Sequence, residues 1–438
     1  MNRTRWGNVG AAAFALAVAG SCATAEHPQI ESLASPPAPA SFDANLVQRG
    51  AALAAVGNCR GCHTPPGAPA YSGGVPLKSP FGTLYTSNIT PDPETGIGRW
   101  SEEAFRRAMR EGVDRRGEHL YPAFPYDHYT LVTDEDDRAI YAYLMTRAAA
   151  SNRPPPNELV FPFNARGSIA AWKKLYFHPG PFQPDPAHDA QWNRGKYLTD
   201  GLGHCSACHS PRNKLQAEEQ GKYMDGGEAE GWHAYAINAR SAAPEAWTVE
   251  AMHEYLRRGW TADHGVARGP MAGVSRELAE ASDADVRAMS VYVVSLMGNE
   301  RHVPPQPRSA GDTRAARIYA GACAVCHDNG DPLPFGGIAM ARSIGVSGES
   351  PRNLANVILY GLPAAGDATA PVMPGFAGAL TDAELVELMA WLRARYTDQP
   401  PWPDLAQKVR EARAAGEEAA SESAGGTGAD PARVAEGR

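Results

Sequence analysis

The sequence has no uninterrupted apolar run as long as a membrane-spanning helix. No stretch of its 438 residues reaches the roughly 18 apolar residues that a span requires. It also has no glycine-rich Gly-x-Gly-x-x-Gly turn or P-loop that would indicate a nucleotide site. Positive charge is scarce, because 41 Lys and Arg stand against 49 Asp and Glu and leave a net charge of −8. We therefore expect no nucleic-acid partner, since such binding needs clustered positive charge.

The overall composition is that of a folded protein with several domains. Hydrophobic residues make up 43% of the chain, which is enough to form buried cores. At roughly 150 residues per domain, the length suggests about three domains. The 37 prolines predict long, irregular connections between them.

The N-terminus has the features of an export signal. In residues 1–25, two arginines precede a short apolar run over residues 9–19, and a small-residue cleavage site follows. Cleavage before Cys22, with lipid attached to that thiol, is the alternative. The proline-rich residues 26–41 predict a flexible tether. We expect a periplasmic protein, either free or attached to the cytoplasmic membrane.

Six of the seven cysteines form three Cys-x-x-Cys pairs, and a histidine follows each pair. The pairs are Cys59 and Cys62, Cys205 and Cys208, and Cys323 and Cys326, and the histidines are His63, His209 and His327. Cys-x-x-Cys-His is the attachment signature of c-type haem. The two thiols form thioethers with one porphyrin, and the imidazole binds its iron. Zinc and a redox dithiol explain the pattern less well, because zinc sites use paired motifs and a dithiol needs no histidine. We therefore predict three covalently bound haem c groups.

Each motif lies in a repeated pattern of predicted helices. Helix-like stretches precede the motifs at residues 46–56, 192–202 and 313–320. Each repeat ends in an amphipathic helix that begins at a hydroxyl residue with an acid three positions later, as in a capping box. These starts are Thr133, Ser282 and Thr381. The plan resembles class I cytochrome c and implies an all-α fold of three tandem domains joined by Pro-rich linkers.

The repeats define the expected domain boundaries. The domains cover residues 42–150, 188–298 and 312–398, the linkers cover 151–187 and 299–311, and the polar tail covers 399–438. The tail is rich in Ala, Glu, Gly and Ser, with no apolar stripe beyond its first turns. We expect it to be solvated and disordered.

Two methionines are candidates for the sixth iron ligand. Met373 stands eight residues before Thr381 in the third repeat, and Met271 stands eleven before Ser282 in the second. Both lie in loops before the last helix, where a class I cytochrome places this ligand. Thioether ligation raises the reduction potential relative to nitrogen ligation.

The first repeat departs from this pattern. Aligning the repeats places Phe124 where a methionine is expected, and phenylalanine cannot bind iron. Met109 lies on a helical stretch and is better explained as core. His119 and His128 flank Phe124, and we favour His128, which would give bis-histidine ligation and a lower potential. A five-coordinate iron, with His128 an ordinary surface residue, is the alternative.

Further motifs give a family resemblance. They are residues 85–92, 95–101, 120–123, 170–175, 179–182 and 192–195, together with Gly203 and His204 before the second haem motif. Taken together with the three haem motifs, they resemble the three-haem cytochrome c subunit of membrane-associated periplasmic dehydrogenases. This family serves alcohol, gluconate, sorbitol and aldehyde dehydrogenases and molybdenum hydroxylases of the isoquinoline or nicotinate type. The version with Phe124 looks more like the cytochromes that partner molybdopterin enzymes.

The resemblance implies an electron-transfer subunit with no catalytic residues of its own. It would take single electrons from a catalytic subunit of molybdopterin, flavin or quinoprotein type, and pass them to quinone or a further cytochrome. Many members end in an amphipathic membrane-binding helix. The polar tail lacks one, so attachment would be peripheral, through a partner or through a lipidated Cys22. The alternatives are a peroxidase-like enzyme with an open first haem and a free-standing shuttle to a terminal oxidase.

Overall fold

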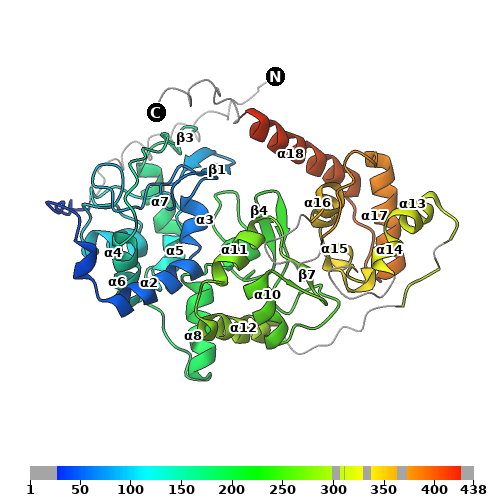
Figure 1. Ribbon diagram of the computed structural model, residues 1–438, viewed down its shortest axis with the longest axis horizontal. Helices are drawn as coiled ribbons and strands as arrows, with labels where there is room; N and C mark the ends of the chain where they lie inside the picture. The colour runs from blue at the N-terminus through cyan, green and yellow to red at the C-terminus, as the bar shows by residue number, and fades with distance from the viewer. Residues whose placement is uncertain (1–26, 298–305, 310, 329–336, 363–371, 426–438) are drawn as a thin grey trace, which may run out of the picture. The chain divides into compact units, whose positions relative to one another are not determined.

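The protein is described by a computed structural model, which defines residues 27–297, 306–309, 311–328, 337–362 and 372–425. These residues belong to two compact units, and Figure 1 labels their helices and strands. The first unit contains the described residues up to Asp189, Lys196–His204 and Glu280–Ser282. The second contains Ala190–Gly195, Cys205–Ala279 and the described residues from Asp283 onward. The predicted export signal with Cys22 and most of the predicted linker 299–311 lie outside the described residues.

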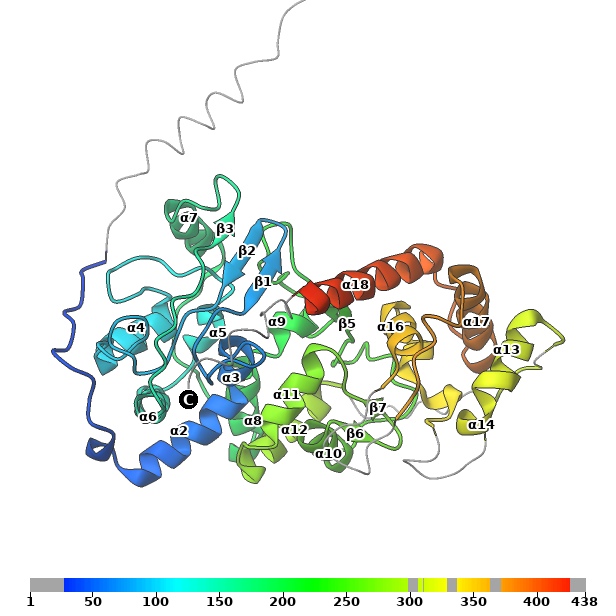
Figure 2. The ribbon, with the colours of Figure 1, turned by 45° about the horizontal axis from the view of Figure 1, so that its top comes forward.

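The first unit is a set of helices with one small sheet. Its elements are η1 (Pro39–Ser41), α2 (Ala44–Val56), α3 (Cys59–His63), β1 (Pro76–Ser79), β2 (Gly82–Tyr85), α4 (Glu102–Glu111), α5 (Tyr126–Tyr129), α6 (Asp134–Met145), β3 (Glu158–Leu159) and α7 (Gly167–Tyr176). The antiparallel strands have the order β1-β2-β3 (Figure 2). Leu77 lies opposite Leu84, and Thr83 lies opposite Glu158.

The second unit is also mainly helical. Its elements are α9 (Ser206–His209), β4 (Gly227–Ala229), β5 (Trp232–Ala234), α10 (Val249–Arg258), β6 (Trp260–Thr261), β7 (Gly265–Val266), α11 (Pro270–Leu278), α12 (Asp283–Met297), α13 (Arg314–Ala322), α14 (Ala324–His327), η2 (Met340–Arg342), α15 (Ile344–Ser347), α16 (Arg352–Tyr360), α17 (Asp382–Tyr396) and α18 (Leu405–Gly425). Helix α8 (Ala190–Asp200) contributes residues to both units. The described residues are mainly helical, as the predicted all-α class requires, but they also contain short antiparallel strands.

One ion pair recurs between the helix before each motif and the last helix of each repeat. The pairs are Arg49 with Asp136, Arg194 with Asp285, and Arg314 with Glu384. The acid is the third residue of the later helix in every case. There it also lies near the positive end of the helix dipole. The contacts join α2 to α6, α8 to α12 and α13 to α17.

In two of these helix crossings, a glycine lets the backbones of the two helices approach each other closely. A Cβ atom on Gly50 would lie 1.9 Å from the carbonyl oxygen of Ala139, and one on Gly195 would lie 2.0 Å from that of Ala288. Each glycine directly follows the arginine of its ion pair. Ala315 takes this place in the third crossing and is buried. The backbones can approach this closely only where no side chain intervenes.

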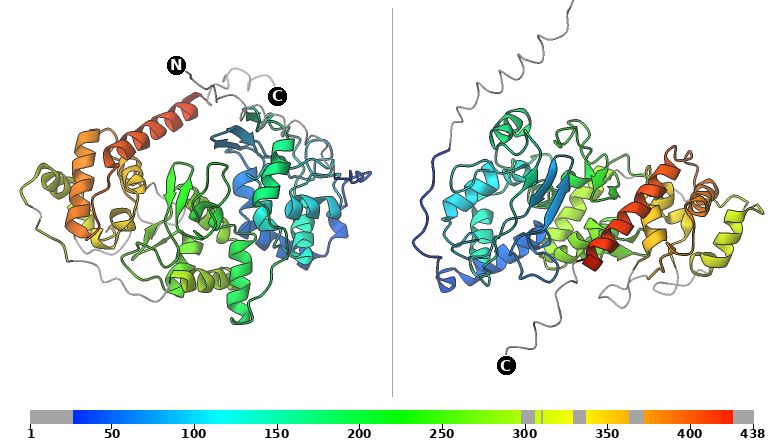
Figure 3. Two further views of the ribbon diagram at one scale, coloured as in Figure 1. Left: turned by 180° about the vertical axis from the view of Figure 1, so that it is seen from behind. Right: turned by 90° about the horizontal axis from the view of Figure 1, so that it is seen from above.

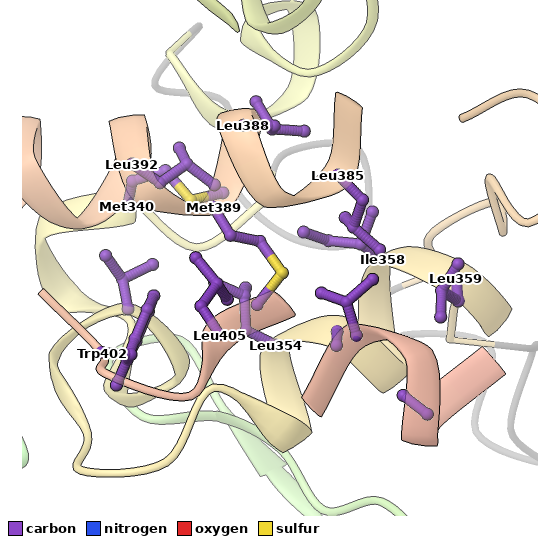
Figure 4. Packing of buried hydrophobic residues seen from close by; sticks show 14 of the residues in the cluster. Met340, Leu354, Ile358, Leu359, Leu385, Leu388, Met389, Leu392, Trp402 and Leu405 are labelled. Carbon is purple, nitrogen blue, oxygen red and sulfur yellow. The ribbon is translucent and has the colours of Figure 1, made fainter. Parts of the chain in front are cut away.

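The core of the second unit includes a cluster around α16, α17 and α18 (Figure 4). Leu385, Leu388 and Leu392, which the sequence places on the apolar face of the last helix, are each at most 2% exposed. Thr381 caps α17 in a full capping box with Glu384, as predicted. At the start of α6, the hydroxyl of Thr133 accepts a hydrogen bond from the amide of Asp136, which is one half of such a box.

The prediction of a disordered tail is wrong for its first part, which forms α18 against α17 (Figure 3). Leu405, Val409 and Ala412 lie on one face and are buried in the cluster. Arg413 donates to two backbone carbonyls before α17, each at 2.8 Å. Apolar packing and these polar contacts together dock the helix on the core. Within the described ranges, no helix is both long and apolar enough to cross a membrane.

The predicted tether 26–41 and linker 151–187 are also more ordered than expected. The amide of Ile30 donates to the carbonyl of Arg115, and that of Leu33 donates to the carbonyl of Arg99, both at 3.0 Å. In the linker, β3 extends the sheet and α7 carries Lys173. The Nζ atom of Lys173 donates to the carbonyl of Gly112 at 2.8 Å, at the C-terminal end of α4. A cation is favourable there because of the helix dipole, so both segments pack on the first unit.

Candidate haem-binding sites

Each Cys-x-x-Cys-His motif ends in a short helical turn. Helix α3 contains the whole first motif, while α9 and α14 contain the last residues of the second and third. Among the described residues, none of the six motif cysteines forms a disulfide; the first of each pair is half-buried and the second is exposed. Thiols at positions i and i+3 of a helical turn lie on one face. Both thiols of a pair can therefore reach one planar ring.

Each motif histidine makes the same hydrogen bond. Its Nδ1 atom donates to a backbone carbonyl that lies later in the chain. The bonds run from His63 to Ser87 (2.6 Å), from His209 to Tyr235 (2.7 Å) and from His327 to Ile338 (2.8 Å). A proton on Nδ1 leaves the lone pair on Nε2, which is the atom that a metal ion would bind. The bond also fixes the orientation of the ring.

The environment keeps these imidazoles neutral. Burial lowers the pKa of His63, His209 and His327, and the hydrogen bond to the carbonyl opposes this shift only in part. A neutral imidazole with a free Nε2 lone pair is the form that binds iron. Two thiols and one oriented imidazole at each motif fit a c-type haem. The sites are therefore chemically consistent with the predicted cofactor.

A β-hairpin frames the second site. Tyr235, whose carbonyl accepts the bond from His209, directly follows β5. Trp232, in the same strand, packs against the backbone of Gly269. A Cβ atom on Gly269 would lie only 2.4 Å from the Trp232 ring. Gly269 has a φ of 57° and precedes α11, whose second residue is the half-buried Met271. The hairpin thus contacts both the motif histidine and the segment of the predicted sixth ligand.

The third site lies at the edge of the buried cluster. Cys323 and the half-buried Met373 pack against the same core residues. Met373 is held by two backbone hydrogen bonds with Leu362, at 2.9 and 3.0 Å. A Cβ atom on Gly337 would lie 2.6 Å from Nδ1 of His327, so only glycine fits beside this ring. The structure therefore places the predicted Met373 and its motif on a common core.

The first site has aromatic side chains where a methionine would be expected. Phe124 is half-buried, and its ring lies 5.3 Å from that of Tyr129. Burial raises the pKa of Tyr129 well above its usual value, and the nearby thiols of Cys59 and Cys62 raise it further. Helix α5 therefore lies next to the first motif. Met109 is buried on α4, at 5% exposure, in agreement with its interpretation as core.

The two candidate histidines of the first site have different surroundings. The Nδ1 atom of His128, on α5, donates to the carbonyl of Asp200 at 2.8 Å, which is the bond that the motif histidines also make. Nδ1 of His119 faces Nζ of Lys173 at 3.2 Å instead. Burial, together with nearby cations, lowers the pKa of His119 to about 4. His128 thus makes the hydrogen bond that the motif histidines also make, whereas Nδ1 of His119 faces the lysine of α7.

Some residues at the sites carry no sequence signal. The carbonyls of Ser87, Tyr235 and Ile338 are backbone groups, so no residue type marks them. Asn88 serves a turn, as loop asparagines usually do. Its Nδ2 atom donates to Thr95 Oγ1 at 2.9 Å, and its Oδ1 atom accepts from the amide of Thr90 at 2.9 Å.

Comparison with known proteins places these sites in a family. A family model described as cytochrome c matches residues 47–148, and one described as subunit III of cbb3-type cytochrome c oxidase matches residues 310–392. The first and third haem motifs lie within these ranges, and the second lies between them. Such domains imply covalently bound haem c, and with it a role in electron transfer.

The relatives extend this result to nearly the whole chain. The fructose dehydrogenase cytochrome subunit of Gluconobacter japonicus is 33% identical over 417 residues, covering 87% of this chain and 85% of the relative. The gluconate 2-dehydrogenase cytochrome c subunit of Pantoea cypripedii is 34% identical, covering 80% and 86%. The chain therefore belongs to the family of cytochrome c subunits of dehydrogenases.

A further relative is a longer protein. A nicotinate dehydrogenase subunit of Pseudomonas putida is 45% identical over 388 residues, which cover 86% of this chain. The chain spans only about a third of the length of that relative, since the match covers 33% of it.

Proposed function

We propose that the chain carries three haem c groups and transfers single electrons between a catalytic dehydrogenase subunit and a downstream acceptor. When bound, haem supplies one-electron chemistry at iron. The cysteine pairs would hold each porphyrin, and His63, His209 and His327 would provide the axial imidazoles. Met271, Met373 and His128 would provide the opposite ligands. The observation that carries the proposal is the hydrogen bond from Nδ1 to a carbonyl, made at all three motifs.

The repeated packing supports three tandem class I cytochrome c domains. The arginine–acid pair recurs at the same place in all three helix crossings. A repeated crossing of a first and a last helix is what three copies of one domain would produce. The third domain and most of the second would share one compact unit.

The partners follow from the relatives. Their names describe subunits of fructose, gluconate and nicotinate dehydrogenases. We infer a catalytic partner of molybdopterin, flavin or quinoprotein type, with quinone or a further cytochrome as acceptor. The complex would work in the periplasm, either free or at the cytoplasmic membrane through the partner or a lipidated Cys22.

The haem count is the direct test. Purified chain should give a pyridine haemochrome spectrum of c type and an intact mass with three haem additions. A variant with both Cys205→Ser and Cys208→Ser should lose one addition and keep two. A colourless protein, or fewer than three additions in the unchanged chain, would contradict the proposal. Co-purification with a dehydrogenase subunit whose substrate reduces the haems would test the partner.

A further inference from the structure

Helix α16 holds the β4–β5 hairpin of the second site through the side chain of Asn353. The Oδ1 atom of Asn353 accepts from the amide of His233 at 2.8 Å. Its Nδ2 atom donates to the carbonyl of the same residue at 2.7 Å. One amide thus pairs with both backbone groups of a strand residue, as a neighbouring strand would.

Other contacts fix the hairpin in the same place. The Nε2 atom of His233 lies 2.7 Å from Oε1 of Glu349, which precedes α16. Nδ2 of Asn356 donates to the carbonyl of Gly231 in the hairpin turn at 3.1 Å. The strand, one of its side chains and the turn are therefore all bound to α16 and to Glu349 just before it, which belong to the third repeat.

The strand clamped in this way is the one that supports His209. Tyr235 lies two residues beyond His233, and its carbonyl accepts the hydrogen bond from Nδ1 of His209. Two extended residues span only about 7 Å. A shift of the strand at His233 would therefore move the carbonyl of Tyr235 and lengthen or bend this bond.

We propose that Asn353 is a positioning residue for the iron ligand of the second haem, so that the third domain tunes the potential of its neighbour. The inference rests on the proposed function, because it requires a haem at His209. A strong bond from Nδ1 to a carbonyl makes the imidazole a better electron donor and stabilises oxidised iron. Releasing the strand weakens that bond, so the potential of this haem should rise.

The test compares two asparagines of one helix. Asn353→Leu removes both bonds to His233, whereas Asn356→Leu removes the single bond at the hairpin turn. Spectroelectrochemical titration of the full chain should show one of three midpoint potentials moving upward in the first variant and by clearly less in the second, because Gly231 lies farther along the chain from Tyr235 than His233 does. Low-spin EPR of the oxidised protein should show the g-values of one haem changing with it. Met271→His identifies that haem, because it replaces the predicted sixth ligand and should move the same signal.

The haem count distinguishes a failure of the proposed function from a failure of the positioning role of Asn353. A haemochrome count below three in the unchanged chain would overturn the proposed function itself. With three haems bound, unchanged potentials and EPR in Asn353→Leu would overturn the positioning role. The same holds if Asn356→Leu causes an equal shift. If Asn353→Leu does not fold, Asn353→Ser decides, because its short hydroxyl cannot reach both backbone groups and the potential must still rise.

Discussion

At the scale of single residues, His233 shows how a histidine outside the haem motifs can carry charge at neutral pH. Burial alone would lower its pKa, but hydrogen bonds from its ring to Glu228 and Glu349 outweigh this effect. Together with the charges of the two carboxylates, they raise the pKa of His233 to about 9. The Nδ1 atom lies 3.0 Å from Glu228 and Nε2 lies 2.7 Å from Glu349. Its sequence neighbours give no sign of this.

The charged ring should make the stability of the second unit depend on pH. The pKa of His233 rises on folding from 6.5 to about 9, so its contribution is complete below pH 6.5 and is lost as the pH rises through 9. Allowing for the half-exposed carboxylates, we expect a loss of about 2 kcal/mol. Two arginines also lie close to these carboxylates: Arg352 lies beside Glu228, and Arg393 lies near Glu349.

Thermal unfolding between pH 6 and pH 10 measures this effect. The melting temperature of the unchanged chain should fall toward pH 10 more steeply than that of His233→Gln. The half-exposed His188, which lies 3.9 Å from Asp185, provides the control His188→Gln, which should follow the unchanged chain. Parallel curves for the unchanged chain and His233→Gln would show that the ring contributes no pH-dependent stability.

At the scale of elements, the helix crossing depends on the absence of a side chain at Gly50. Gly50→Ala would place a methyl carbon 1.9 Å from the carbonyl oxygen of Ala139, so α2 and α6 must separate. Alanine gains about 1 kcal/mol in helix propensity, whereas overpacking costs about 1–3 kcal/mol or more. We expect a net loss of about 1–2 kcal/mol in urea unfolding, because the 1.9 Å contact lies at the severe end of overpacking.

A second glycine provides the matched control for this substitution. Gly167 begins α7, and no other heavy atom lies within 4 Å of a Cβ atom built there. Gly167→Ala should therefore leave the free energy of unfolding unchanged or slightly higher. Equal effects of Gly50→Ala and Gly167→Ala would show that the close crossing is not what requires Gly50.

The sequence predicted those elements whose signals are local. Thr133 and Thr381 marked helix starts because a cap and its acid lie within four residues. Helix α18 was missed because Leu405, Val409 and Ala412 form a stripe too weak to recognise without the core that receives it. Strand β3 is only two residues long, and its pairing depends on β2, far away in the sequence. Such elements are set by tertiary contacts.

At the scale of the whole molecule, each of the three sites also combines a local sequence signal with contacts from distant segments. Each Cys-x-x-Cys-His motif is contiguous and could be read directly, but the carbonyl that orients each histidine lies 11 to 26 residues away. The predicted sixth ligands also come from other segments. These ligands differ among the repeats. Met271 and Met373 are predicted in the second and third, whereas in the first Phe124 replaces the methionine and His128 is the predicted ligand. The three proposed haems should therefore differ in reduction potential.

We expect the first haem to have the lowest potential of the three, because imidazole ligation favours oxidised iron more than thioether ligation does. His128→Met should raise this potential toward the other two in a redox titration of the full chain and add a Met-type absorption band. His119→Gln is the control and should leave all three potentials in place, since His119 faces Lys173. If the first haem titrates at the highest potential, with Met-type spectra for all three haems before any substitution, His128 is not its ligand. The different hydrogen bonds of His128 and His119 would then reflect packing and not iron ligation.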